Sequence, residues 1–357
     1  MRSSTTTRRR TWVLFVIGLL AVVAVTVVQL AAAGKVMIIQ SNSAGDSVML
    51  IDPTIDKVVA EINGIEVGHG VAPSPDGTRL YVTNEGLATV DVVDMATLSV
   101  IKRIPLTGPP NNIAIHKDGH RVYAAITGAT GGVDVIDTVK LEKIKFIRVL
   151  GGVHNTIITP DSKFVVAGST GGFQATAIDT QLERAAWSIF FGDGEGVRVF
   201  CFEANPDGST KRMFTQLTNL HGFAVVDWQS RKELTRIKLP DIPVAERNSE
   251  GIQGAPAHGI LVTPDGKQMW STSKFNSRVY GYSMPDLKYL GEVKVGLVPD
   301  WITYTPDSKK MYVANAHDNT VSVVDIVARK EITRIKVGQV PKRNATGIFT
   351  VVGNGTN

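Results

Sequence analysis

The chain has 357 residues, of which 43% are hydrophobic and 20% charged, a composition that excludes a disordered chain and supplies a large core. Four arginines in the first ten residues account for most of the net charge of +5, since 34 basic residues face 33 acidic ones in the remainder, and no nucleic-acid partner is expected. Cys201 is the only cysteine, which excludes an intrachain disulfide and a cysteine-rich metal or iron–sulfur centre.

Residues 1–33 have the pattern of an export leader. The basic stretch "MRSSTTTRRR" precedes an uncharged apolar run that ends in Ala31-Ala32-Ala33. This pattern predicts a signal peptide that is cleaved before Gly34, or an uncleaved membrane anchor formed by residues 12–33. In both cases the positive-inside rule places residues 34–357 outside the cytoplasm, in the periplasm or extracellular space. We expect contact with a membrane only through this segment.

A short turn recurs through the rest of the chain. It has the form Pro-Asp-Gly or a close variant, and successive copies are 42, 43, 46, 58 and 42 residues apart. About fifteen residues after each copy, an alternating run such as "VDVVD" ends in an aspartate, as at Asp94 and Asp325, although "VYGYS" ends in Ser283 instead. Because these residues repeat, we expect them to set turns and cap strands rather than to act on a ligand. The turns begin at Pro75, Lys117, Pro160, Pro206, Pro264 and Pro306.

A period near 42 residues, built only from short alternating strands, is the size of one four-stranded propeller blade. Counting the strand sets gives seven blades, of which the first begins at its second strand, "KVMIIQSN". The final apolar run, residues 345–352, is predicted to supply the missing inner strand and to close the ring. The sequence therefore predicts a single all-β, seven-bladed β-propeller over residues 34–357.

Two stretches connect this repeat to a known family. "LYVTNEG" (residues 80–86) and "MYVANAHDNTVSVVD" (residues 311–325) resemble the YVTN-type β-propeller repeat, and the likeness covers residues 35–352. The resemblance implies the fold and an exported protein. It does not imply one activity, because propellers of this kind have varied functions.

A candidate site emerges where the blades differ. The innermost strand of each blade lines the central channel, and its first residue is found by counting back six positions from the turn. That register gives His69, Asn111, His154, Phe200, His258 and Asp300, with Thr346 at the equivalent place in the closing strand. Three of the seven histidines fall at this register. Neighbouring segments are expected to add His221, His317, Asn84, Asn315 and Arg198 to the same face.

Two main interpretations of this cluster remain open. Imidazole is the commonest protein ligand of zinc, copper and iron, so the cluster could hold a divalent or transition metal ion in an enzyme of hydrolase, lyase or oxidoreductase type. Glu66 or Glu250 would then be the base. The other interpretation, which we favour because it requires the least, is that the channel face binds a protein or small-molecule ligand without catalysis.

A redox-cofactor carrier, by architectural analogy alone, is the third interpretation. It has no covalent haem motif to support it.

Residues 239–257, which lengthen the connection between the fifth and sixth blades, could cover the channel mouth beside His258 or form a plain insertion.

Overall fold

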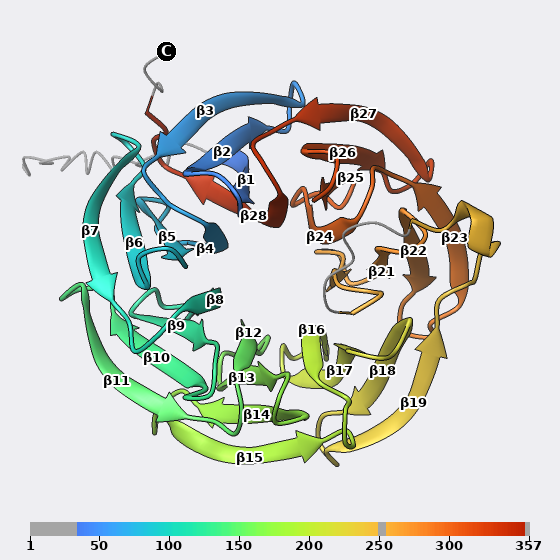
Figure 1. Ribbon diagram of the computed structural model, residues 1–357, viewed down its shortest axis with the longest axis horizontal. Coiled ribbons are helices and arrows are strands. Elements are labelled where there is room, and N and C mark those ends of the chain that lie inside the picture. The colour runs from blue at the N-terminus through green and yellow to red at the C-terminus, as the bar shows by residue number, and fades with distance from the viewer. Residues whose placement is uncertain (1–33, 249–254, 354–357) are drawn as a thin grey trace, which may run out of the picture. The chain divides into compact units, whose positions relative to one another are not determined.

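The computed structural model describes residues 34–248 and 255–353, which form a ring of seven blades around a central channel (Figure 1). Each blade is an antiparallel sheet of four strands. This confirms the predicted seven-bladed propeller. The predicted leader lies outside the described residues. Within the part of the chain that is described, no helix is long and apolar enough to cross a membrane.

The strands follow one another from the channel outwards in every blade. Blade one contains β28 (Pro341–Phe349), β1 (Lys35–Asn42), β2 (Ser47–Asp52) and β3 (Lys57–Asn63). Blade two contains β4 (Gly68–Pro73), β5 (Arg79–Asn84), β6 (Thr89–Asp94) and β7 (Ser99–Pro105), and blade three contains β8 (Pro110–Ile115), β9 (Arg121–Ile126), β10 (Gly132–Asp137) and β11 (Glu142–Arg148). Blade four contains β12 (Val153–Ile158), β13 (Phe164–Ser169), β14 (Gln174–Asp179) and β15 (Arg184–Phe190).

The remaining blades repeat this order. Blade five contains β16 (Val197–Ala204), β17 (Thr210–Leu217), β18 (Gly222–Asp227) and β19 (Lys232–Lys238). Blade six contains β20 (Ile260–Val262), β21 (Gln268–Ser273), β22 (Arg278–Ser283) and β23 (Tyr289–Lys294), and blade seven contains β24 (Pro299–Tyr304), β25 (Lys310–Asn315), β26 (Thr320–Asp325) and β27 (Lys330–Lys336).

Burial along each strand explains why the middle strands are nearly continuous apolar runs. In β9, five of six residues are buried, because both faces of the blade pack against neighbouring blades. The outermost strand β7 is mostly exposed instead, and only Ile104 is buried. Seven clusters of buried apolar side chains result, one between each pair of adjacent blades. Cys201 is one of these core residues.

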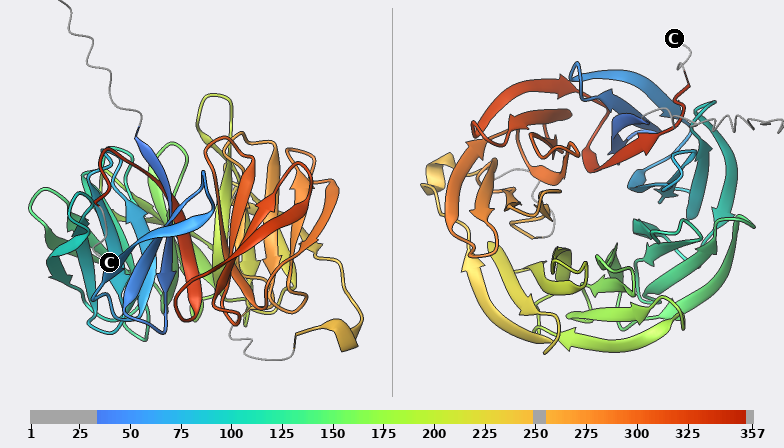
Figure 2. Two further views of the ribbon diagram at one scale, coloured as in Figure 1. Left: turned by 90° about the horizontal axis from the view of Figure 1, so that it is seen from above. Right: turned by 180° about the vertical axis from the view of Figure 1, so that it is seen from behind.

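The ring closes through strands from opposite ends of the chain. β28 pairs antiparallel with β1, from Lys35 opposite Phe349 to Asn42 opposite Pro341, and the two lie side by side when the ring is seen from behind (Figure 2). Closure by the C-terminal strand was predicted, although the strand begins at Pro341 and not at Ala345. Phe349 is fully buried in the cluster between blades one and two.

The repeated aspartates have the structural role expected of them. In the first turn, Asp76 Oδ1 accepts hydrogen bonds from the Ser74 hydroxyl and from the Thr78 backbone N–H at 2.6 and 3.0 Å, and Gly77 takes a φ of +69°. At the end of β6, Asp94 Oδ1 accepts from the backbone N–H groups of Ala96 and Thr97.

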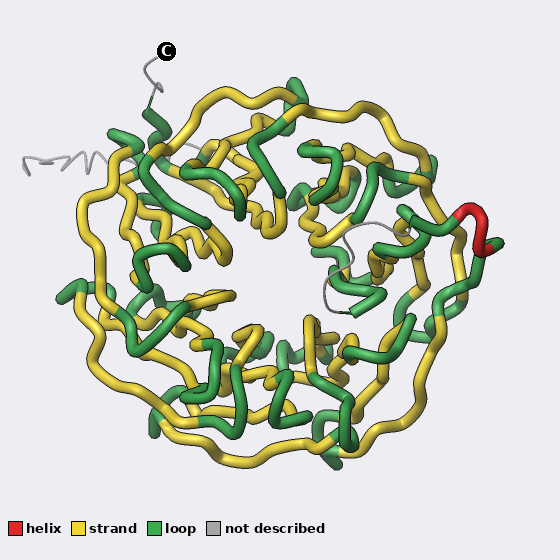
Figure 3. The backbone as a smooth tube through the Cα atoms, in the orientation of Figure 1, coloured by secondary structure: helices red, strands yellow, loops and turns green. Residues whose placement is uncertain are grey.

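Residues 239–257 are described only in part. The short 3₁₀ helix η1 (Val244–Glu246) lies at the outer rim of the ring, away from the channel (Figure 3). Residues 249–254 fall outside the described range, so a role of this segment over the channel mouth stays a prediction.

Candidate functional site

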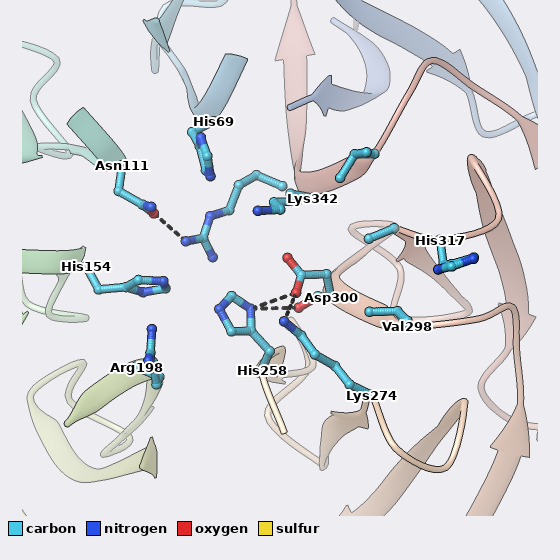
Figure 4. Close-up of a pocket in the computed structure, with 13 residues that line it drawn as sticks. His69, Asn111, His154, Arg198, His258, Lys274, Val298, Asp300, His317 and Lys342 are labelled. Atoms are coloured by element: carbon cyan, nitrogen blue, oxygen red, sulfur yellow. Dashed lines mark hydrogen bonds and ion pairs between the residues drawn. The ribbon is translucent and has the colours of Figure 1, made fainter. Parts of the chain in front are cut away.

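Each blade contributes one side chain to the same mouth of the channel. These residues occupy equivalent positions at the start of the innermost strand, and together they line a cavity of about 330 Å³ (Figure 4). Arg343, Lys274 and His317 line it as well. The seven equivalent residues are His69, Asn111, His154, Arg198, His258, Asp300 and Lys342.

Counting back from the turn gave two wrong members of this set. In blade five the position belongs to Arg198, not Phe200, because β16 has eight residues and its pairing with β17 shifts twice. Phe200 is fully buried between blades four and five. In blade one the position belongs to Lys342 and not Thr346, since β28 has no following turn from which to count.

A second signal in the sequence would have located Lys342. "VPD" at Val298–Asp300 and "VPK" at Val340–Lys342 have the same form, and both valines adopt a positive φ, 55° and 51° respectively. Aligning these two tripeptides places Lys342 of blade one at the position that Asp300 occupies in blade seven.

Several other predicted members lie outside the cavity lining. The Asn84 amide donates a hydrogen bond to Asp91, and the Asn315 amide donates one to the Ser322 hydroxyl. Each bond connects two neighbouring strands of the same blade. His221 contacts the Ser273 hydroxyl through Nε2 at 2.8 Å. Glu66 is exposed, and Glu250 falls outside the described residues.

Arg343 is the most deeply buried charge of the site. Its side chain is only 1% exposed and its guanidinium stacks on the Trp301 ring, with 4.0 Å from Cζ to the ring centroid. Nη2 donates to Asn111 Oδ1 at 2.5 Å, whereas Nε and Nη1 have no hydrogen-bond partner among the described residues. Burial lowers the pKa of Arg343 to about 10, so it stays charged at neutral pH.

Two imidazoles face each other beside this guanidinium. The rings of His154 and His258 are 5.2 Å apart, edge to face. His258 Nδ1 is 3.2 Å from the Asp300 carbonyl oxygen and 3.3 Å from its carboxylate Oδ1, which also lies 2.6 Å from Lys274 Nζ. A proton on Nδ1 shared with Asp300 leaves the lone pair of His258 on Nε2.

The protonation states follow from burial and from the surrounding charges. Burial, reinforced by the charge of Arg343, holds the pKa of His154 well below its usual value. Burial also lowers the pKa of His258, although the Asp300 carboxylate opposes the shift. For Asp300, burial alone would raise the pKa, but His258, Lys274 and the cations of β28 outweigh it and keep the carboxylate ionised.

His69 has a carboxylate partner of its own. Its Nδ1 lies 2.8 Å from Glu85 Oε2. Burial lowers the pKa of His69 despite this contact, whereas the hydrogen bond from His69 lowers the pKa of Glu85.

These donors do not fit a metal ion. Across residues 34–248 and 255–353, no three His, Cys, Asp or Glu side chains are grouped as a metal would require. The cavity also holds four basic side chains, which repel a cation. The predicted zinc, copper or iron site therefore gains no support from the geometry. The four basic residues are Arg198, Lys274, Lys342 and Arg343.

Comparison with known proteins bears on the fold. No family model and no curated protein matches the sequence. Among solved structures, the chain is similar to the hydrazine synthase of Kuenenia stuttgartiensis, with 24% identity, a TM-score of 0.70, and coverage of 81% of this chain and 92% of that one.

Two further similar structures bear the names of lactonases. The periplasmic gluconolactonase of Pseudomonas aeruginosa has 16% identity, a TM-score of 0.71 and coverage of 87% and 99%. A protein described as a 6-phosphogluconolactonase from Bacteroides fragilis has 18% identity, a TM-score of 0.69 and coverage of 88% and 98%. At these identities the likeness establishes a seven-bladed β-propeller, whose function has to be argued from its own residues.

Proposed function

We propose that this chain is an exported ligand-binding propeller whose channel mouth binds a small organic anion, most simply a carboxylate. The observation that carries the proposal is Arg343, a buried guanidinium of which two N–H-bearing nitrogens find no partner among the described residues. Leaving a buried donor unsatisfied costs about 1–3 kcal/mol. A carboxylate accepts two parallel hydrogen bonds from such a fork and compensates its charge.

The charge balance around Arg343 supports the same ligand class. Four basic side chains line the cavity, whereas within residues 34–248 and 255–353 Asp300 and the Glu85 partner of His69 supply two carboxylates nearby. A concave site with excess positive charge concentrates anions. The cavity of about 330 Å³ suits a small molecule and not a folded partner.

The proposed location rests on the leader and on one similar protein. Residues 1–33 have the pattern of an export signal or anchor, and the similar gluconolactonase is named as periplasmic. We therefore place the binding site in the periplasm or extracellular space.

Isothermal titration of the full-length chain with acetate, succinate and inorganic phosphate tests the anion site. We expect at least one of the carboxylates to bind, and the Arg343→Met variant to lose roughly 10- to 150-fold in affinity, because a hydrogen bond to a charged group contributes about 1.5–3 kcal/mol. The matched control is Arg148→Met, at an exposed arginine of β11. Unchanged affinity in Arg343→Met would refute the proposal.

A second candidate function, hydrolysis of a lactone, is favoured by the pairing of His258 with Asp300. Asp300 fixes His258 Nδ1, so that Nε2 can take a proton from water as the water oxygen attacks the lactone carbonyl carbon. The ring C–O bond then breaks, and the proton passes from Nε2 to the leaving alkoxide. Arg343 would stabilise the oxyanion and the product carboxylate. Two of the similar structures carry lactonase names.

Proton release from δ-gluconolactone, corrected for spontaneous hydrolysis, tests this candidate. Loss of a general base typically costs 10²- to 10⁴-fold in rate, so we expect a decrease of roughly that size for His258→Gln. His120→Gln, at an exposed histidine of the turn between β8 and β9, is the control. If the protein binds a carboxylate but does not hydrolyse the lactone, the proposed binding function stands and the hydrolysis is excluded.

A further inference from the structure

A second compartment of the channel begins on the other side of Arg343. It is a cavity of about 280 Å³ lined by residues of β4, β8, β12, β24 and β28. Arg343 is the one described residue that lines both this cavity and the cationic mouth. The guanidinium therefore stands at the boundary between a charged compartment and this one.

The lining of the second compartment is mostly apolar, and much of it is only half-buried. Val71 and Ile113 are largely covered, whereas Ile115, Ile157, Ile158 and Trp301 keep part of their surface open to the channel. Apolar surface of this kind gains free energy when a ligand removes it from water, at about 25 cal/mol per Å².

The side-chain donors of this lining are engaged by the scaffold. Asn112 donates to the Thr156 carbonyl oxygen at 3.3 Å, and the Thr156 hydroxyl donates to the Tyr123 carbonyl oxygen at 3.0 Å. Asn344 donates its amide to the Gln40 side chain and the Tyr312 carbonyl oxygen. These donors are already used within the protein, whereas Arg343 Nε and Nη1 have no partner among the residues that the structure describes.

We propose that this compartment binds the apolar part of an alkyl or aryl carboxylate whose anionic group meets the Arg343 guanidinium. The inference rests on the proposed anion site and specifies its ligand class: an amphipathic acid rather than a uniformly polar one. Trp301 serves both parts, since its ring stacks on the guanidinium and lines the apolar compartment. The volume is roughly twice the 150 Å³ that accommodates a benzene ring.

A homologous series of ligands tests the inference. The full-length chain is titrated calorimetrically with acetate, butanoate and hexanoate. We expect affinity to rise by up to about fourfold for each added methylene group, the value for complete burial of that group. Ile157→Asn and Ile115→Asn keep the number of side-chain heavy atoms but make the wall polar. We expect the hexanoate-to-acetate affinity ratio to fall at least about fivefold in each.

Ile144→Asn, at an exposed isoleucine of β11, is the matched control, and thermal unfolding verifies that every variant is folded. Acetate binding that depends on Arg343, with no gain from longer chains, would overturn the inference and leave the anion site standing. Binding of no carboxylate, or binding indifferent to Arg343→Met, would overturn both. Equal weakening of acetate and hexanoate by Ile157→Asn would also count against the apolar compartment.

Discussion

Two polar regions of this propeller contrast sharply, the turn around Asp76 and the channel around Arg343. Asp76 Oδ1 accepts hydrogen bonds from the Ser74 hydroxyl and from the backbone and hydroxyl of Thr78, and equivalent turns occur in other blades. Arg343 occurs once, is almost completely buried and finds no partner for two of its nitrogens in the part of the chain that is described. Polar groups that repeat and are satisfied build the scaffold. This buried charge breaks the repeat and lies in the channel, which makes it the candidate ligand contact.

This contrast implies that stability and ligand binding depend on different residues. A substitution in the scaffold should reduce the free energy of unfolding and leave affinity unchanged. A substitution at Arg343 should reduce the affinity and should not reduce the free energy of unfolding. The following variants test that separation, beginning with the largest expected effect on stability.

Phe349→Ala should produce the largest loss. The side chain is fully buried where β28 closes the ring, and truncation of a buried phenylalanine costs about 3–5 kcal/mol through lost burial and the cavity left behind. Urea unfolding measures the change. Ile348→Ala is the control next to it, since Ile348 is 52% exposed. Equal losses in the two variants would mean that closure does not depend on this contact.

Acidification should weaken the fold through the channel histidines. Burial keeps the pKa of His154 and His258 well below the value of about 6.5 that they have when unfolded. The unfolded chain therefore binds more protons below that pH, and the free energy of unfolding rises with pH. The free energy of unfolding therefore reaches its full value above about pH 6.5, where both histidines are neutral in either state. It decreases as the pH falls, by at most about 1.4 kcal/mol per pH unit for each histidine.

Urea unfolding at pH 7.5, 6.5 and 5.5 measures this slope. The double variant His154→Gln/His258→Gln should show a shallower dependence over the same range, because glutamine does not titrate. If the slopes of the wild type and the double variant coincide, these two histidines are not the source of the pH dependence.

Asp76→Ala should cost about 1 kcal/mol, the usual contribution of an intramolecular hydrogen bond that is partly open to water. Asp76→Asn retains the side-chain carbonyl acceptor and should cost less. Both variants should bind the anion as the wild type does. A change in affinity would show that the turn and the channel are coupled.

The same contrast explains how much the sequence could predict. Strand number, blade order and ring closure follow from a repeat in which turn and strand patterns agree, so they could be predicted from the sequence. His69, Asn111, His154, His258 and Asp300 were placed together because each precedes its turn by the same number of residues.

The strongest charges of the site could not be found in that way. Arg343 and Lys342 belong to blade one but lie some 300 residues from its other strands, and a register shift in β28 opposite Gln40 and Asn42 displaces them from any simple count. Lys274 enters from the far end of β21 and not from an innermost strand. In the sequence Arg343 and Lys274 look like ordinary surface cations, and only the folded ring shows that they converge with Lys342.

The smallest effect on stability is expected for Arg343→Met, and it is the most informative. Removing a charge usually destabilises a protein when it leaves a buried partner uncompensated, yet here Asp300 keeps Lys274 at 2.6 Å and His258 close by. Methionine fills much of the same volume against Trp301 and removes two unsatisfied nitrogens, a type of replacement that is often neutral or stabilising by about 1–4 kcal/mol. We expect unchanged or slightly increased stability in urea unfolding, together with loss of anion binding. A clear loss of stability would instead make Arg343 part of the scaffold, and its unpaired nitrogens would no longer be an argument for a ligand.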